Sequence, residues 1–252
     1  MPPLKYFAPN SCTALSLVLG LSSAALSAQG NFRLAAWMIL WGVLLDKADG
    51  TIARLCKATS EFGLQFDSFA DFVVFGIAPA ALIYFRLQAT NRYAGWGEIG
   101  LLIVAGLYVL ALAVRLARFN IVAGHKALFY GIPGTLMGAI VAAGYLTWDK
   151  YALGPAVLQY GPALLLVGAL AMVSNLRIPK LAVRKSMALN VFQFGNVIAA
   201  YIIAPLMLGP DYLLALALLY TLGGVGWCLV RPAPPEGTTD VDEDDEPQEQ
   251  PA

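Results

Sequence analysis

The chain is dominated by long runs of apolar residues that short polar breaks separate. A helix needs about 20 apolar residues to cross the hydrocarbon core of a bilayer. Breaks at charged, glycine or proline residues divide the chain into eight predicted helical spans: 12–28, 32–49, 67–87, 99–117, 134–148, 155–174, 189–208 and 211–230. The pattern therefore predicts an all-α, polytopic transmembrane helical bundle of about eight spans.

The composition agrees with a chain that lies in lipid. Hydrophobic residues make up 59% of the 252 residues and charged residues only 13%, and the mean hydropathy is +0.68. These values exclude an ordinary soluble domain. The first apolar run is interpreted as an uncleaved span and not as a signal peptide, because several comparable spans follow it. We expect a lipid bilayer, and no nucleic acid, as a partner.

The last segment differs sharply from the rest. Beyond Arg231 the chain is rich in Pro, Gly and Thr and holds eight acids: Glu236, Asp240, Asp242, Glu243, Asp244, Asp245, Glu246 and Glu249. With so few apolar residues to bury, residues 233–252 are predicted to form a disordered acidic tail behind a transmembrane domain at residues 1–232. Without those eight acids, 16 basic and 8 acidic residues leave a net charge of about +8. Such a charge suits anionic lipid headgroups and phosphorylated substrates. The alternative interpretation is that the excess Lys and Arg only fix the membrane topology.

Lys and Arg residues gather in the cytoplasmic loops of membrane proteins, which gives a test of orientation. With both termini in the cytoplasm, the eight spans leave only Arg33, Arg86, Arg92 and Lys150 on the outer side. The other 12 of the 16 basic residues lie on the cytoplasmic side. The charge pattern therefore supports an even number of spans and a cytoplasmic active face.

Acidic residues are concentrated at two predicted span ends. Asp46 and Asp49 are spaced i, i+3, and Asp67 and Asp71 are spaced i, i+4, so each pair lies on one face of a helix. Ionisable residues at such positions are costly and usually functional. We expect the two helix ends to direct four carboxylates at one point.

Crowded carboxylates require a compensating charge, and the repulsion is about 4 kcal/mol per pair at 4 Å. Oxygen ligands without His or Cys select magnesium, manganese or calcium over zinc. Four carboxylates are enough for two ions about 4 Å apart, which is an arrangement used in phosphoryl chemistry. The alternatives are a structural cluster paired with Lys47, Arg54 and Lys57, and a calcium loop of the EF-hand type, whose odd-position spacing the acids do not follow.

The string D-x2-D-G-x2-A-R-x8-G-x3-D-x3-D, from Asp46 to Asp71, resembles the signature of the CDP-alcohol phosphatidyltransferase family at every fixed position. The resemblance implies that Asp46 and Asp67 bridge two metal ions, magnesium or manganese, that Asp49 binds one and Asp71 the other, and that Asp71 also accepts the proton of the incoming hydroxyl. It further implies residues that bind CDP-diacylglycerol, namely Asn10, Thr13, Gly50, Arg54 and Ser60.

The segments Ser60–Gly63, Asp67–Asp71 and Phe75–Ala80 are most similar to bacterial phosphatidylserine synthases, as is Arg115–Asn120. A serine carboxylate suits a planar guanidinium that binds it bidentately, so Arg115 and Arg118 are candidate acceptor-binding residues, although Arg at a span end also serves topology. A second basic cluster, Arg177, Lys180, Arg184 and Lys185, leaves glycerol phosphate or inositol phosphate as alternative acceptors, and choline is a further one.

The resemblance thus implies transfer of a phosphatidyl group from CDP-diacylglycerol to serine, in the inner membrane of a bacterial-type cell and by a homodimer. The hypothesis from another class is a cation-coupled transporter, in which intramembrane Asp residues serve as ion sites. Transporters place such acids near the bilayer midplane in broken helices, whereas these acids lie near span ends. An inactive scaffold is the third alternative, and the complete set of acids argues against it.

Overall fold

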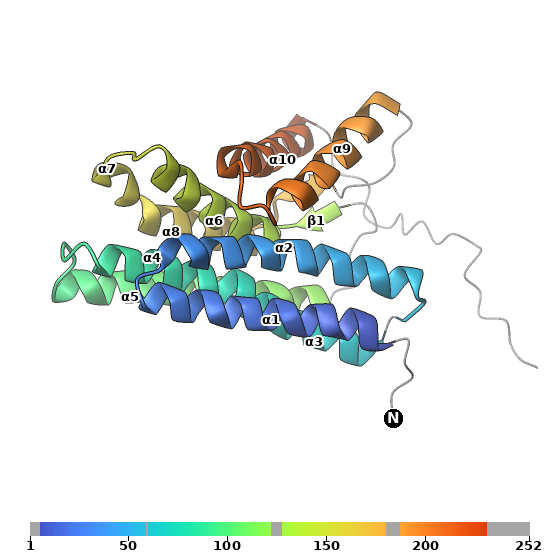
Figure 1. Ribbon diagram of the computed structural model, residues 1–252, viewed down its shortest axis with the longest axis horizontal. Helices are drawn as coiled ribbons and strands as arrows, with labels where there is room; N and C mark the ends of the chain where they lie inside the picture. Colours follow the sequence, from blue (N-terminus) through green and yellow to red (C-terminus); the bar gives the residue numbers. More distant parts are fainter. Residues whose placement is uncertain (1–5, 59, 122–127, 180–186, 231–252) are drawn as a thin grey trace, which may run out of the picture.

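The computed structural model describes residues 6–58, 60–121, 128–179 and 187–230. These residues are mostly helical, as predicted, and the helices at residues 7–28, 32–55 and 96–121 run along the longest axis of the molecule (Figure 1). The tail at 233–252 and the basic residues Lys180, Arg184 and Lys185 lie outside the described residues. The helices are α1 (Phe7–Ala28), α2 (Phe32–Leu55), α3 (Glu61–Asp71), α4 (Ala78–Gln88), α5 (Trp96–Ile121), α6 (Gly134–Lys150), α7 (Pro155–Leu158), α8 (Gly161–Val173), α9 (Met187–Ile203) and α10 (Pro210–Val230).

Within those described residues, four helical segments are long and apolar enough to cross a membrane. They are Phe7–Ala28, Glu61–Gln88, Trp96–Ile121 and Pro155–Val173, and Met187–Ile203 is a shorter apolar helix. A helical element matches each predicted span, although α2 continues to Leu55, beyond the expected end at residue 49. Membrane integration is therefore supported, while the count of eight spans stays a prediction.

A short β pairing was not predicted. Strand β1 (Leu128–Tyr130) pairs antiparallel with β2 (Arg177–Pro179), and Phe129 lies opposite Ile178. Gly131 follows β1 with a φ of +73°, and a Cβ there would lie 2.2 Å from the carbonyl oxygen of Met172, so this turn requires glycine. The pairing joins the segment before α6 to the segment after α8.

Helix α1 packs on its neighbours through a stripe of small residues. Its buried positions recur every three or four residues: Pro9, Thr13, Ser16, Gly20, Ser23 and Ser27. Small side chains let helix backbones approach closely in a membrane, where packing and hydrogen bonds drive association. The hydroxyl of Ser23 donates to the backbone carbonyl of Ala35 on α2 at 2.8 Å. This stripe holds α1 against α2 along most of its length.

Between α3 and α4 the chain forms a π-helix, η2 (Phe72–Ile77). A π turn disturbs the regular hydrogen-bond ladder, and the hydroxyl of buried Tyr108 donates to the carbonyl of Phe75 at 3.0 Å. Val74 is fully buried, and a Cβ added to Gly20 or Gly42 would lie 2.8 Å or 2.4 Å from its atoms. The absence of a side chain at Gly20 on α1 and at Gly42 on α2 therefore makes room for η2, directly after Asp71.

Candidate active site

The two acidic pairs are held by α2 and α3, whose ends are defined by local sequence. Helix α2 continues through Gly50 and ends at Leu55, two residues before Lys57, which adopts a positive φ of 49°. Helix α3 begins at Ser60, whose Oγ accepts a hydrogen bond from the backbone N–H of Gly63 at 3.0 Å, which is ordinary N-capping. Ser60 thus has a structural role beside its predicted contact with the donor.

Three of the four predicted metal ligands converge. One carboxylate oxygen from each of Asp46, Asp49 and Asp67 lies within 4.8 Å of the others. Asp49 is buried, with 5% exposure, while Asp46 and Asp67 are partly buried. Asp71 is not part of this three-residue group, but its carboxylate interacts electrostatically with those of Asp46 and Asp67. The four acids therefore share one environment.

A third helix, α1, also contacts the cluster. The hydroxyl of Thr13 on α1 donates to Oδ2 of Asp49 at 2.8 Å, and both side chains are buried. A bond of this kind fixes the orientation of a carboxylate, as the outer-shell partners of metal ligands do. Asn10, one turn earlier, faces the start of α3, since its Oδ1 would lie 3.5 Å from a Cβ on Gly63. The sequence predicted both residues as donor contacts but not the bond from Thr13 to Asp49.

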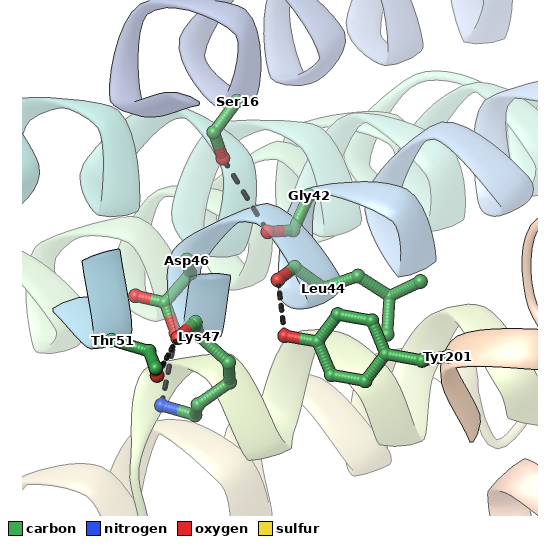
Figure 2. Close-up of polar contacts among 7 residues, drawn as sticks. All are labelled: Ser16, Gly42, Leu44, Asp46, Lys47, Thr51 and Tyr201. Carbon is green, nitrogen blue, oxygen red and sulfur yellow. Dashed lines mark hydrogen bonds and ion pairs between the residues drawn. The ribbon is translucent and has the colours of Figure 1, made fainter. Parts of the chain in front are cut away.

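The segment of α2 just before Asp46 is attached to two other helices, as Figure 2 shows. The hydroxyl of Tyr201 on α9 donates to the backbone carbonyl of Leu44 at 2.8 Å. The hydroxyl of Ser16 on α1 lies 3.5 Å from the carbonyl of Gly42. Tyr201 carried no sequence signal, because its partner is 157 residues away in the chain.

Lys47 is the cation nearest to the carboxylates among the described ion pairs. Its Nζ lies 2.9 Å from Oδ2 of Asp46 (Figure 2), and its side chain is 61% exposed. It also interacts electrostatically with Asp71 and Asp67. A single, largely exposed ammonium group cannot balance four carboxylates.

The donor set suits a hard divalent cation. All the converging ligands are carboxylate oxygens, which magnesium, manganese and calcium prefer. Gly50 and Arg54 follow on the exposed part of α2, spaced i, i+4, and a Cβ on Gly50 would meet no atom within 4 Å. The cluster therefore has an open side next to the exposed cationic side chain of Arg54. This arrangement fits metal-assisted binding of an anionic substrate.

The two arginines at the end of α5 differ in their surroundings. Arg115 is partly buried and interacts electrostatically with Asp71 and Asp46. Arg118 is exposed, and its Nη2 donates to Oδ1 of Asn175 at 2.8 Å. Arg115 thus interacts with the carboxylates, whereas Arg118 is bonded to Asn175. Asn175 was missed by sequence reasoning, since nothing but its place after α8 marks it.

Comparison with known proteins gives consistent matches. The sequence model described as CDP-alcohol phosphatidyltransferase matches residues 6–174. A Helicobacter pylori protein (strain ATCC 700392 / 26695) named CDP-diacylglycerol--serine O-phosphatidyltransferase is 38% identical over 69% of this chain and 72% of its own length. A Bacillus subtilis (strain 168) protein of the same name is 29% identical over 69% of this chain and 90% of its own. An archaetidylserine synthase from Methanothermobacter thermautotrophicus is 30% identical over 64% and 67%, respectively.

Proposed function

This chain belongs to the CDP-alcohol phosphatidyltransferase family, and from that premise we propose that it transfers the phosphatidyl group of CDP-diacylglycerol to the hydroxyl of L-serine, giving phosphatidylserine and CMP. The observation that carries the chemistry is the convergence of Asp46, Asp49 and Asp67 beside Asp71. The serine acceptor is supported by the names of the relatives. Membership in a family of enzymes leaves the transporter hypothesis without support.

The carboxylates are proposed to hold two divalent ions, magnesium or manganese. In this scheme Asp46 and Asp67 would help to hold both ions, Asp49 would hold one, and Asp71 would hold the other. When bound, the ions offset the charge of the pyrophosphate and of the departing CMP. Thr13 orients Asp49 through its 2.8 Å hydrogen bond and thereby acts on the donor site indirectly.

Asp71 is proposed to be the general base. It takes the proton of the serine hydroxyl, and the serine oxygen forms a bond to the phosphorus that carries the diacylglycerol. The bond from that phosphorus to the CMP oxygen breaks, and CMP leaves with the electron pair. The partly buried position of Asp71, next to Asp46 and one turn from Asp67, suits a base that must work away from bulk water. Water would otherwise hydrolyse the donor.

The donor is proposed to lie along the open side of α2. Gly50 leaves room for the nucleotide, since no atom lies within 4 Å of its missing Cβ, and exposed Arg54 offers charge-assisted hydrogen bonds to phosphate. Asn10 and Ser60 meet at the start of α3, where both side chains approach Gly63. Asn10 and Ser60 would line the pyrophosphate end of the site, and Thr13 would support it through Asp49.

The proposed setting is a bacterial-type inner membrane, with residues 1–232 as a transmembrane domain of eight spans, a disordered tail at 233–252, and a homodimeric assembly. Both termini and the active site would face the cytoplasm. The distribution of Lys and Arg supports this orientation. The site lies where α2 ends and α3 begins, and Figure 1 shows both ends on the side of the bundle where the N-terminus lies.

The direct test is release of CMP from CDP-diacylglycerol by the purified full-length protein with manganese or magnesium. Serine, glycerol phosphate, inositol phosphate and choline are compared at one donor concentration, with Asp67→Asn as an inactive control and Arg92→Gln as an active one. We expect metal-dependent release with serine only. Release with glycerol phosphate but not serine would overturn the acceptor, and no release with any acceptor would overturn the proposed function.

A further inference from the structure

The last turn of α5 is held by side-chain hydrogen bonds on two sides. On one side, Nδ2 of Asn120 donates to Oγ of Ser68 at 3.0 Å and approaches Oε1 of Gln65 at 3.4 Å. On the other side, Nη2 of Arg118 donates to Oδ1 of Asn175 at 2.8 Å. The first contact ties α5 to α3 beside Asp67, and the second ties it to the segment between α8 and β2. These bonds fix the rotation of α5 about its own axis.

Arg115 lies one turn before Arg118 on α5. It interacts electrostatically with Asp71 and Asp46. Its Nε is buried and has no hydrogen-bond partner in the part of the chain that the structure describes. Buried donors are nearly always paired, and the Nε edge of a guanidinium is one of those that bind a carboxylate bidentately. Burial beside Asp71 therefore leaves one donor of Arg115 without a partner within the described residues.

We propose that Arg115 binds the carboxylate of the acceptor, and that Arg118 is a positioning residue that acts through Asn175. The inference rests on the proposed transfer to serine. In a molecule as small as serine, a carboxylate held by Arg115 also brings the hydroxyl toward Asp71. Arg118, exposed and bound to Asn175, holds α5 so that Arg115 keeps this position, with Asn120 as the second attachment.

A different role for Arg115 would be that of a permanent counter-ion for Asp71 and Asp46. The two roles differ in what they affect. A counter-ion supports metal and donor binding as much as acceptor binding, whereas a carboxylate ligand affects the acceptor only. Likewise, if Arg118 touched the acceptor directly, removing Asn175 would leave acceptor binding unchanged.

The test compares serine with serine methyl ester, which lacks the carboxylate charge, in CMP-release assays with CDP-diacylglycerol and manganese. The wild-type protein should show a KM at least about tenfold higher for the ester. Arg115→Lys and Arg115→Gln should lose this discrimination while the KM for the donor stays within about twofold. Arg118→Gln should keep the discrimination. Arg92→Gln is the matched control, because it removes an exposed arginine from the loop between α4 and α5.

A double-mutant cycle then tests the positioning role. Arg118→Gln and Asn175→Ala should each raise the KM for serine about threefold, and the double variant should be no worse than either single variant. A strong effect of Arg118→Gln with a silent Asn175→Ala would overturn the positioning role. Equal loss of donor and serine binding in both Arg115 variants would overturn carboxylate binding. Absence of serine-dependent CMP release by the wild-type protein would instead overturn the proposed function itself.

Discussion

Replacing Gly20 by alanine tests whether the close packing of α1 against η2 sets the position of Asp71. A Cβ at residue 20 would lie 2.8 Å from Cα and 3.0 Å from the backbone N of Val74. Because these are backbone atoms, no rotamer change relieves the contact. Val74 follows Asp71 by less than one turn in the same continuous helical segment. Any movement of η2 therefore displaces the proposed base.

The size of the effect follows from the contact distance. Non-bonded carbon atoms prefer a separation of about 3.5–4.0 Å, so η2 must move by roughly 1 Å. Overpacking of this kind costs about 1–3 kcal/mol, and a misplacement of about 1 Å at the reacting groups costs on the order of 100-fold in rate. We therefore expect Gly20→Ala to lower both the melting temperature and, more strongly, kcat.

Gly106→Ala is the matched control, because Gly106 lies in helix α5 and a Cβ there would meet no atom within 4 Å. Both substitutions gain about 1 kcal/mol of helix propensity, so the difference between them isolates the packing clash. The assays are thermal unfolding of the purified protein in detergent and CMP release at saturating serine and donor. A Gly20→Ala protein with the melting temperature and kcat of the Gly106→Ala protein would refute the reasoning.

Three further predictions concern the carboxylates. Asp71→Asn should keep manganese and nucleotide binding but lower kcat by about 10²–10⁴-fold; near-normal turnover would remove its assignment as the base. Thr13→Val, which deletes the hydroxyl bonded to Asp49, should weaken manganese binding about 10–100-fold, whereas Thr13→Ser should not. Equal affinities of the Val and Ser variants in a manganese titration would contradict this. Lys47→Gln should tighten manganese binding by up to about fivefold. The exposed ammonium of Lys47 competes with the metal ion for Asp46, and such an ion pair contributes at most about 1 kcal/mol. Weaker manganese binding in the variant would show instead that Lys47 supports the site.

The sequence predicted the features that depend on short stretches of chain. Apolar runs of nearly constant length marked the helices, and the positions of Gln29-Gly30-Asn31 and Gly209-Pro210 marked two of the breaks, which the structure places at residues 29–31 and 204–209. The i, i+3 and i, i+4 spacings predicted that each acidic pair shares a face. The structure brings Asp46, Asp49 and Asp67 together, and the joint role of all four carboxylates stays a prediction.

The features that were not predicted depend on contacts between distant residues. The pairing of β1 with β2 involves three residues in each strand, too few for a period-2 pattern to stand out. The π turn after Asp71 is stabilised by Gly20, Gly42 and Tyr108 from three other helices. The different surroundings of Arg115 and Arg118 depend on Asn175, which is 57 residues away from Arg118. Local spacing alone therefore predicted the same acceptor-binding role for both arginines.

Charge balance connects the cluster to the donor it is proposed to bind. The four carboxylates, with Lys47 and Arg115 as the cations that interact with them, leave a formal charge of about −2, which repels an anionic pyrophosphate. One divalent ion would only neutralise this charge. Two ions would reverse it to about +2, which matches the roughly two negative charges of the donor's pyrophosphate. A site in which these four acids interact is therefore suited to attract CDP-diacylglycerol only when both proposed ions are bound. Metal loading would then have to precede or accompany donor binding.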